Sequence, residues 1–161
     1  MRFFLSIFVS LLVVVSACGK KESKGVNSTS SEQEIYSILE NYYETMSDRN
    51  WKLYADFFSN KATLTTLWEA PADSFPKVTT YTIDDFLSQT KDGPDSQPIF
   101  EERMLHAEIS ARQNLASAWV EYEAKFGSED SLIEWKGYDL FSMIKFENKW
   151  KIVSIVYESE N

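Results

Sequence analysis

Apolar residues recur with helical spacing early in the chain and with strand spacing later. From Ile35 to Met46 they fall at positions i, i+3, i+4, i+7, i+8 and i+11, which predicts one amphipathic helix. Ser31 and Glu34 have the spacing of a capping box at its start. Asn50 is suited to cap a second, shorter helix that is unusually rich in aromatic residues.

The pattern then changes to that of strands. Residues 62–68 predict a strand, and residues 69–81, which contain two prolines, predict an irregular loop. Thr82 and Asp85 predict the start of a short helix. Residues 100–111, 115–126 and the hairpin 137–157 predict an antiparallel meander. The order predicts an α+β domain in which N-terminal helices pack in a curved antiparallel sheet.

The last hairpin is the most informative stretch. Glu147 and Asn148 suit a two-residue turn, which would place residue i opposite residue 295−i. Both faces of this hairpin are then apolar, so both must be covered. We expect the chain's own helices on one face and a second subunit on the other. The predicted dimer interface consists of Phe141, Met143, Trp150 and Ile152.

Charge and composition exclude some functions. The formal charge of −9 over 161 residues leaves nothing to neutralise a phosphate backbone, so we expect no nucleic-acid partner. Aromatic residues make up 15% of the chain, which suits a packed core or an aromatic-lined pocket.

The N-terminus carries a specific signal. After Arg2 comes an apolar run, residues 3–15, too short for an ordinary membrane-spanning helix. The following Val-Ser-Ala-Cys-Gly segment resembles the lipobox of bacterial lipoproteins, with Cys18, the only cysteine, as the lipidated residue. We therefore expect a signal peptide (1–17), a flexible tether (18–31) and one domain (32–161), in a protein anchored in the cell envelope. The residue after Cys18 is not an aspartate, which favours the outer membrane.

From about Glu32 to Tyr157 the chain resembles the nuclear transport factor 2-like superfamily. The resemblance rests on the helix with Tyr42, the segments 49–58 and 60–64, the strand 114–122 and the ending 149–157. It implies a cone-shaped fold with a central pocket, and a convex sheet face that is commonly a dimer interface. The superfamily hosts enzymes and binding proteins alike, so the resemblance implies no particular activity.

Ketosteroid isomerases of this superfamily use a tyrosine, a carboxylate base and a protonated acid. The resemblance places these roles on Tyr42, Thr66 and Ser142, so two of the three groups are missing. His106, the only histidine, is predicted to lie opposite Glu121, which offers an acid–base pair. A zinc site needs three or four ligands, and no second histidine or further thiol is present for it. We therefore expect no catalytic residue, no metal and no cofactor.

A pocket remains the best candidate for function. Hydroxyl groups on aromatic walls suit a small, partly hydrophobic ligand. The predicted pocket residues are Tyr42, Tyr54, Phe58, Thr66, Trp68, Tyr122, Tyr138 and Ser142.

The first hypothesis is thus a non-catalytic domain that binds such a ligand or acts as an interaction module. One alternative is an isomerase or hydro-lyase that uses Glu69, Glu121 or Asp139. Another is an accessory domain with a filled core that binds only protein.

Overall fold

A computed structural model describes residues 29–68 and 75–160. The predicted signal peptide, Cys18, the tether up to residue 28, and Glu69 lie outside these ranges. The elements are α1 (Ser30–Ser47), α2 (Trp51–Ala55), β1 (Phe58–Trp68), β2 (Lys77–Thr82), α3 (Ile83–Gln89), the 3-10 helix η1 (Pro94–Ser96), β3 (Ile99–Arg112), β4 (Leu115–Ser128), β5 (Ser131–Phe146) and β6 (Lys149–Ser159).

Local sequence signals set the starts of the helices. Thr29, not Ser31, caps α1: its backbone N–H donates to Glu32, and its hydroxyl accepts from the Glu32 N–H. The prediction of Ser31 with Glu34 was wrong because Glu34 has other partners, accepting hydrogen bonds from Lys145 at 2.9 Å and from the Trp150 indole at 3.2 Å.

The other two predicted caps are confirmed. The Asn50 side chain accepts the Leu53 N–H at 3.2 Å and begins α2. Thr82 and Asp85 form a reciprocal capping box that begins α3.

The strands form one mixed sheet in the order β2-β1-β6-β5-β4-β3. Neighbours are antiparallel except β1 and β6, which are parallel. The strand β2 corrects the prediction of a loop over residues 69–81, because the threonine-rich segment Lys77–Thr82 pairs with β1 along its length.

The predicted turn of the last hairpin is confirmed. Glu147 and Asn148 have φ values of 49° and 61°, as a two-residue hairpin turn requires. The predicted register holds from this turn to the pair Met143–Ile152, and beyond it a bulge shifts the pairing by one residue. A second bulge, after Met104, shifts the β3–β4 register in the same way.

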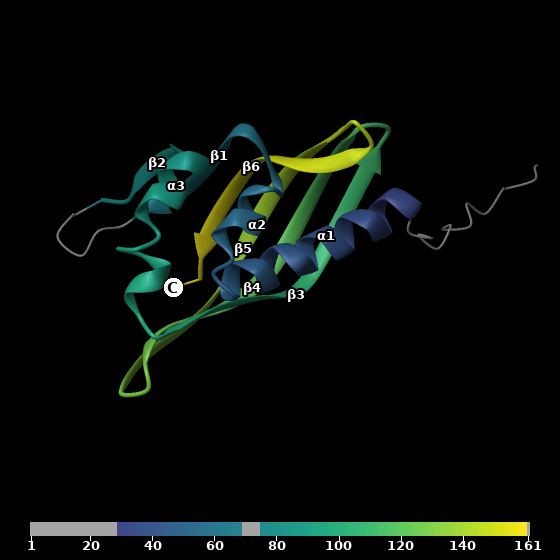
Figure 1. Ribbon diagram of the computed structural model, residues 1–161. Helices are drawn as coiled ribbons and strands as arrows, with labels where there is room; N and C mark the ends of the chain where they lie inside the picture. Colours follow the sequence, from purple (N-terminus) through teal and green to yellow (C-terminus); the bar gives the residue numbers. More distant parts are fainter. Residues whose placement is uncertain (1–28, 69–74, 161) are drawn as a thin grey trace, which may run out of the picture.

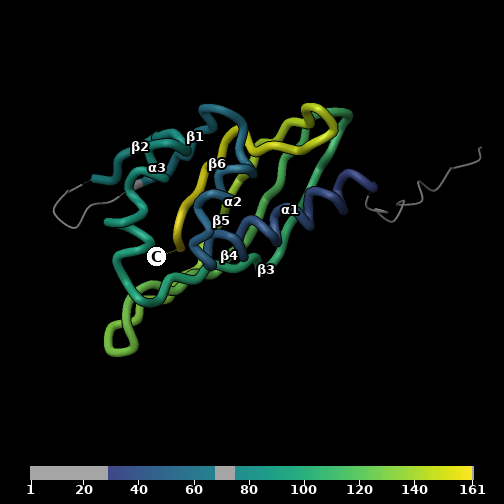
Figure 2. The backbone as a smooth tube through the Cα atoms, viewed as in Figure 1, coloured from purple at the N-terminus to yellow at the C-terminus, as the bar shows by residue number. Residues whose placement is uncertain are grey.

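The sheet curves around α1 and α2, which lie together on its concave side (Figure 1). The tube in Figure 2 shows α3 and β2 at one end of the sheet and the β4–β5 hairpin extending away from the domain. The core lies between the helices and the concave face. Its largest fully buried side chains are Tyr43, Tyr54, Phe141, Ile35, Leu39, Ile152, Ile155 and Val120.

The predicted dimer interface was wrong. Its four residues lie on the concave face and have exposed fractions of 0–3% within a single chain: Phe141, Met143, Trp150 and Ile152. They belong to the core cluster that includes α1, so no second subunit can reach them. The pattern could not decide this, because both faces of the hairpin are apolar in sequence.

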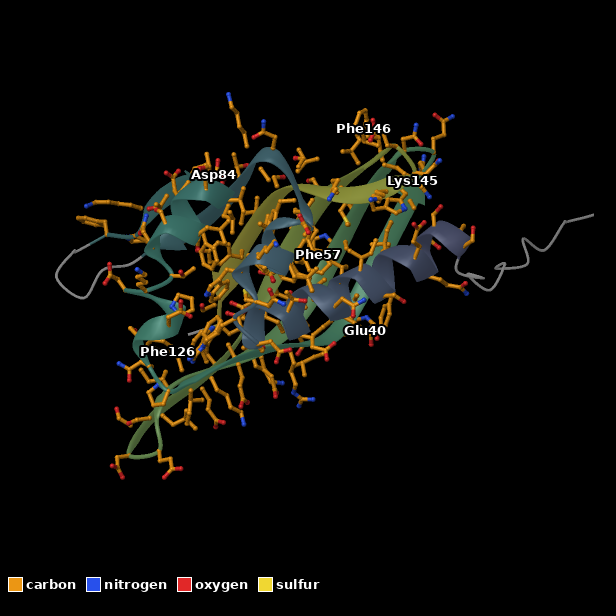
Figure 3. The ribbon with its side chains drawn as sticks, viewed as in Figure 1. Glu40, Phe57, Asp84, Phe126, Lys145 and Phe146 are labelled. Carbon is orange, nitrogen blue, oxygen red and sulfur yellow. The ribbon has the colours of Figure 1, made fainter. Side chains whose placement is uncertain are left out.

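The convex face instead carries many of the exposed apolar residues. Figure 3 shows Phe146 pointing away from the domain at the tip of the β5–β6 hairpin, and Glu40 on the outer side of α1. We call the following set the convex patch: Leu67, Val78, Trp119, Tyr138, Leu140 and Val156. These residues come from β1, β2, β4, β5 and β6 and line a common hollow of about 310 Å³.

The strand β3 forms one edge of the sheet, and α1 covers part of it. The Ser47 hydroxyl accepts the Glu102 N–H and donates to the Glu102 carbonyl, both at 2.8 Å. At the other end of the helix, Glu32 accepts the Ala111 N–H at 3.5 Å. These side chains occupy backbone groups that an edge strand would otherwise leave open to another chain.

Candidate functional site

A cavity of about 560 Å³ lies between α3 and the concave face of β1, β2 and β6. We call it the α3 cavity. Its lining consists of Thr66, Thr79, Tyr81, Phe86, Gln89, Asp92, Gly93, Pro94 and Tyr157. No lysine, arginine or histidine is among these described lining residues. The cavity therefore combines hydroxyl groups and apolar surface without a positive charge.

Strand register brings the floor of this cavity together. Thr66 pairs with Thr79 on β2 and with Tyr157 on β6, so the three side chains share one face of the sheet. The capping box at Thr82 turns the chain into α3 directly after β2. That turn places Phe86 over the sheet, where its ring contacts Tyr54 at a centroid distance of 5.8 Å.

Two tyrosine hydroxyls face one another in this cavity. The hydroxyls of Tyr81 and Tyr157 form a hydrogen bond in which either can donate. Burial raises the pKa of Tyr81 and of Tyr157 above the usual tyrosine value. Both groups therefore keep their protons throughout the physiological pH range and can act as donors.

A buried carboxylate lies next to this pair. Asp139 is only 6% exposed, pairs with Tyr157 across the β5–β6 ladder, and accepts a hydrogen bond from the Tyr43 hydroxyl of α1. Burial raises the pKa of Asp139 to about 7, although the Tyr43 hydrogen bond opposes this rise. Within residues 29–68 and 75–160, no cationic side chain contacts Asp139, so its ionised form is poorly compensated.

Glu102 on β3 is a second acidic group with a raised pKa, and it is half-buried. Burial, and next the charge of Asp139, raise the pKa of Glu102 to about 8. A negative charge in a medium of low polarity disfavours ionisation of another acid, so the charge of Asp139 adds to the effect of burial on Glu102. Acidic groups with pKa values raised toward neutrality are common at sites of acid–base chemistry.

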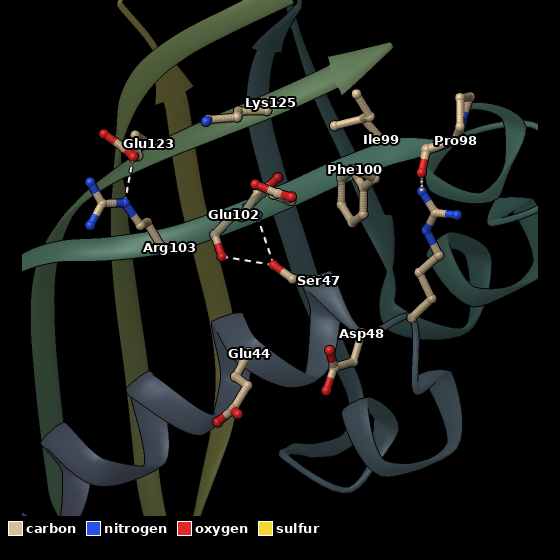
Figure 4. Close-up of a pocket in the computed structure, with 12 residues that line it drawn as sticks. Glu44, Ser47, Asp48, Pro98, Ile99, Phe100, Glu102, Arg103, Glu123 and Lys125 are labelled. Atoms are coloured by element: carbon tan, nitrogen blue, oxygen red, sulfur yellow. Dashed lines mark hydrogen bonds and ion pairs between the residues drawn. The ribbon is translucent and has the colours of Figure 1, made fainter. Parts of the chain in front are cut away.

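Glu102 also lines a separate open cleft of about 790 Å³ at the β3 edge (Figure 4). The cleft contains both signs of charge, and Arg103 bonds Glu123 across it. Arg49 donates to the carbonyl of Gln97 at 2.8 Å and lies 3.9 Å from Asp95. Most of its lining is thus charged, and its arginines already have partners, so it offers a less selective site than the α3 cavity.

The predicted pocket residues are divided among several places. Thr66 lines the α3 cavity. Tyr42, Tyr54 and Phe58 fill the core behind it, where the Tyr54 hydroxyl donates to that of Tyr42 at 2.9 Å. Tyr122 is buried on the concave face, where its hydroxyl lies against Gly137 so closely that a Cβ there would be 2.5 Å away.

The remaining predicted pocket residues lie elsewhere. Tyr138 and Ser142 are exposed on the convex face, so their placement in the central pocket of the cone was wrong. The strand alternation that buries Asp139 and Phe141 necessarily turns their neighbours outward. Trp68 ends β1, and its side chain lies outside the described part of the chain.

The other candidates can also be located. His106 lies opposite Glu121 in the ladder, as predicted, and on the solvent side, 3.9 Å from Glu108. Glu121 is 3.7 Å from Lys136.

Among the described residues, no group of three or more histidine, cysteine or acidic side chains could hold a metal ion. No helix within residues 29–68 and 75–160 is long and apolar enough to cross a membrane.

Sequence reasoning missed four functional groups. Tyr43 appeared only as part of an apolar helix stripe, and Tyr81 only as part of a loop. Tyr157 appeared only as the end of the predicted last hairpin, whose bulge in β6 was not foreseen, and Glu102 has no distinguishing pattern around it. Asp139 was among the three candidate carboxylates, and its position between apolar residues of a strand is the signal that predicts its burial.

Residues 30–158 match the sequence model of a family described as "Putative lumazine-binding". A search among curated proteins found no match. Several solved structures have the same fold. A nuclear transport factor 2-like protein of unknown function from Shewanella baltica OS155 is 21% identical, with a TM-score of 0.58 over 84% of this chain and 99% of that one.

Two further structures are similar in fold. A nuclear transport factor 2-like protein of unknown function from Pseudomonas putida KT2440 is 12% identical, with a TM-score of 0.65 over 83% of this chain and 89% of that one. The beta subunit of benzoate 1,2-dioxygenase from Burkholderia mallei ATCC 23344 is 14% identical, with a TM-score of 0.63 over 80% and 90%. The predicted α+β cone and the predicted superfamily are thereby confirmed.

Proposed function

Since this chain belongs to the family described as "Putative lumazine-binding", we propose that it is a lipid-anchored envelope protein whose domain binds a small, partly hydrophobic ligand in the α3 cavity. The proposed role is non-catalytic. The observation that carries it is the cavity of about 560 Å³, with Phe86 and Pro94 on its walls and the hydroxyls of Thr66, Tyr81 and Tyr157 on its floor.

The chemistry of the cavity fits a flat, uncharged heterocycle. Aromatic and aliphatic walls exclude water, while a few hydroxyls fix the orientation of a ligand. Lumazine, a two-ring heterocycle with carbonyl and N–H groups, is a reasonable first probe, because the family description names it.

The test combines two measurements on the full-length protein. Native mass spectrometry after gentle purification from its own host would reveal a retained molecule and its class. Titration with lumazine, followed by fluorescence, should give saturable binding that Phe86→Ala weakens about tenfold or more. Phe146→Ala, which removes a ring that is 66% exposed, is the matched control and should leave binding unchanged. No retained molecule and no saturable binding would contradict the proposal.

The anchor rests on the sequence around Cys18. Labelled palmitate should be incorporated into the wild-type protein and not into Cys18→Ala, which should also leave the membrane fraction. The acylated N-terminus carries several chains in such proteins, and more than one chain is needed for stable attachment. Separation of inner from outer membranes by density would test the expected outer-membrane location, and equal labelling of both proteins would contradict the anchor.

We further propose a homodimer formed through the convex patch. Its support is the set of large apolar side chains exposed there, with Trp119 at 55%, Val78 at 74% and Val156 at 49%. Sedimentation velocity should give a dimer that Trp119→Glu converts to a monomer. Leu53→Glu, at an exposed apolar residue of α2, should leave the dimer intact. A wild-type monomer at high concentration would refute the dimer.

The alternative function is an isomerase or hydro-lyase, and Asp139 is the observation that favours it. Burial raises the pKa of this carboxyl to about 7, and a general base works best with a pKa near the operating pH. Turnover of a ligand found by mass spectrometry, abolished in Asp139→Asn, would favour the enzyme over the binding protein.

A further inference from the structure

The hydroxyl pair of Tyr81 and Tyr157 has two protons, and only one of them is needed for the hydrogen bond between the two side chains. Within the part of the chain that the structure describes, neither hydroxyl has an acceptor other than its partner. Since both side chains line the α3 cavity, the remaining proton is available to a molecule inside it.

The surroundings select an uncharged acceptor for that proton. The one charged side chain in the described lining of the cavity is the carboxylate of Asp92. Behind Tyr157 lies Asp139, its ladder partner on β5. An anionic ligand would therefore meet negative charges and no cation, whereas a carbonyl oxygen accepts a hydrogen bond without bringing a charge.

The walls favour a flat ring. Phe86 presents an aromatic ring to the cavity and is held by contacts with Trp51 and Tyr54, both at centroid distances of 5.8 Å. Pro94 supplies a second rigid apolar surface. Rigid walls of this kind discriminate by shape, and the hydroxyl pair discriminates by hydrogen bonding.

We propose that the Tyr81–Tyr157 hydroxyl pair donates a hydrogen bond to a ring carbonyl of an uncharged, flat ligand and so determines which molecules the α3 cavity accepts. This inference rests on the proposed function, because it requires that the cavity bind a ligand. A hydroxyl already bonded to another hydroxyl is a stronger donor than one alone, which is the reason for a pair.

The experiment uses two probes of the same two-ring size with the full-length protein. Coumarin carries a ring carbonyl, and naphthalene carries none. We expect wild-type protein to bind coumarin more tightly than naphthalene. In Tyr157→Phe and Tyr81→Phe, coumarin affinity should fall about tenfold, which corresponds to about 1.4 kcal/mol, while naphthalene affinity should not change.

A spectroscopic readout separates this role from a structural one. The infrared carbonyl band of bound coumarin should lie at lower frequency in wild-type protein than in either tyrosine variant. Tyr36→Phe, at an exposed tyrosine of α1, is the matched control and should behave as wild type. Circular dichroism would establish that each variant is folded. Because there are two independent tyrosine variants, the test can still be made if one of them does not fold.

The outcomes distinguish the two proposals. If both probes bind and neither variant weakens coumarin or moves its band, the hydroxyl pair is not the selector and the binding cavity stands. Binding of naphthalene without coumarin has the same meaning. If neither probe binds to wild-type protein, the inference fails together with the α3 cavity as a site for flat ligands.

Discussion

On the strand β5, Phe141 lies on the concave face with no exposed surface, whereas Phe146 lies on the convex face and is 66% exposed. The concave face is covered by α1 and also buries Asp139 with its partner Tyr43. The convex face presents Trp119 and Val156 to solvent. The same residue type therefore stabilises the fold on one face and remains available for a partner on the other. The two phenylalanines are equally hydrophobic, so the difference in their exposure comes from the packing of α1 over the concave face.

The largest expected effect comes from truncating the two phenylalanines. Phe141→Ala should lower the free energy of unfolding by about 3–5 kcal/mol, because it leaves a cavity in a closely packed core. Phe146→Ala should change it by about 0.5 kcal/mol or less. Denaturant unfolding of both variants under one set of conditions checks this. Equal losses would mean that the convex face is covered as well as the concave one.

The change of stability with pH should also be determined by residues of the concave face, namely Asp139 and Glu102. The pKa values of Asp139 and Glu102 are raised from 3.8 and 4.5 to about 7 and about 8. The folded state thus retains protons that the unfolded state has released. Their contribution to stability is present below pH 4 and is lost as the pH rises to about 8, on the order of a few kcal/mol.

The measurement is urea unfolding at several pH values between 4 and 8. Asp139→Asn should flatten the decline, and at pH 8 it should be at least as stable as wild type. Glu40→Gln, an exposed carboxylate on the outer side of α1 (Figure 3), should retain the wild-type slope. A wild-type stability that rises over this range would show that the two acids are ionised and well compensated.

A smaller effect is expected from the hydrogen bond between α1 and the sheet. Tyr43→Phe should cost about 1–3 kcal/mol, because it leaves the buried Asp139 carboxyl without its donor. Tyr36→Phe removes a hydroxyl from a residue that is 41% exposed and should cost almost nothing. Thermal unfolding at pH 6 distinguishes the two. In an Asp139→Asn background the cost of Tyr43→Phe should differ, since the two residues interact directly.

The smallest effect is expected on the convex face itself. Val156→Thr should change monomer stability by about 0.5 kcal/mol or less, because this side chain is 49% exposed and keeps its β-branched shape. Ile155→Thr, at the neighbouring residue that is 1% exposed, should cost several times more. A large loss for Val156→Thr that depends on protein concentration would instead support the proposed dimer.

Much of the secondary structure was readable from the chain because it depends on local rules. The stripe of α1, the caps at Asn50 and Thr82, and the turn at Glu147–Asn148 each need only a few neighbouring residues. The strand β2 was not readable in this way, because the pairing of Lys77–Thr82 with β1 is what makes the segment a strand.

The sequence by itself determined the alternation that separates Phe141 from Tyr138, but not which of them faces the core. Only the tertiary structure decided that, because two apolar faces look alike until α1 packs on one of them. The bulge in β6 opposite Ser142 and Met143 then brought Tyr157 to the concave side beside Asp139 and opposite Tyr81. The candidate site thus depends on contacts between residues far apart in the chain, and their geometry is fixed only when the sheet closes around its helices.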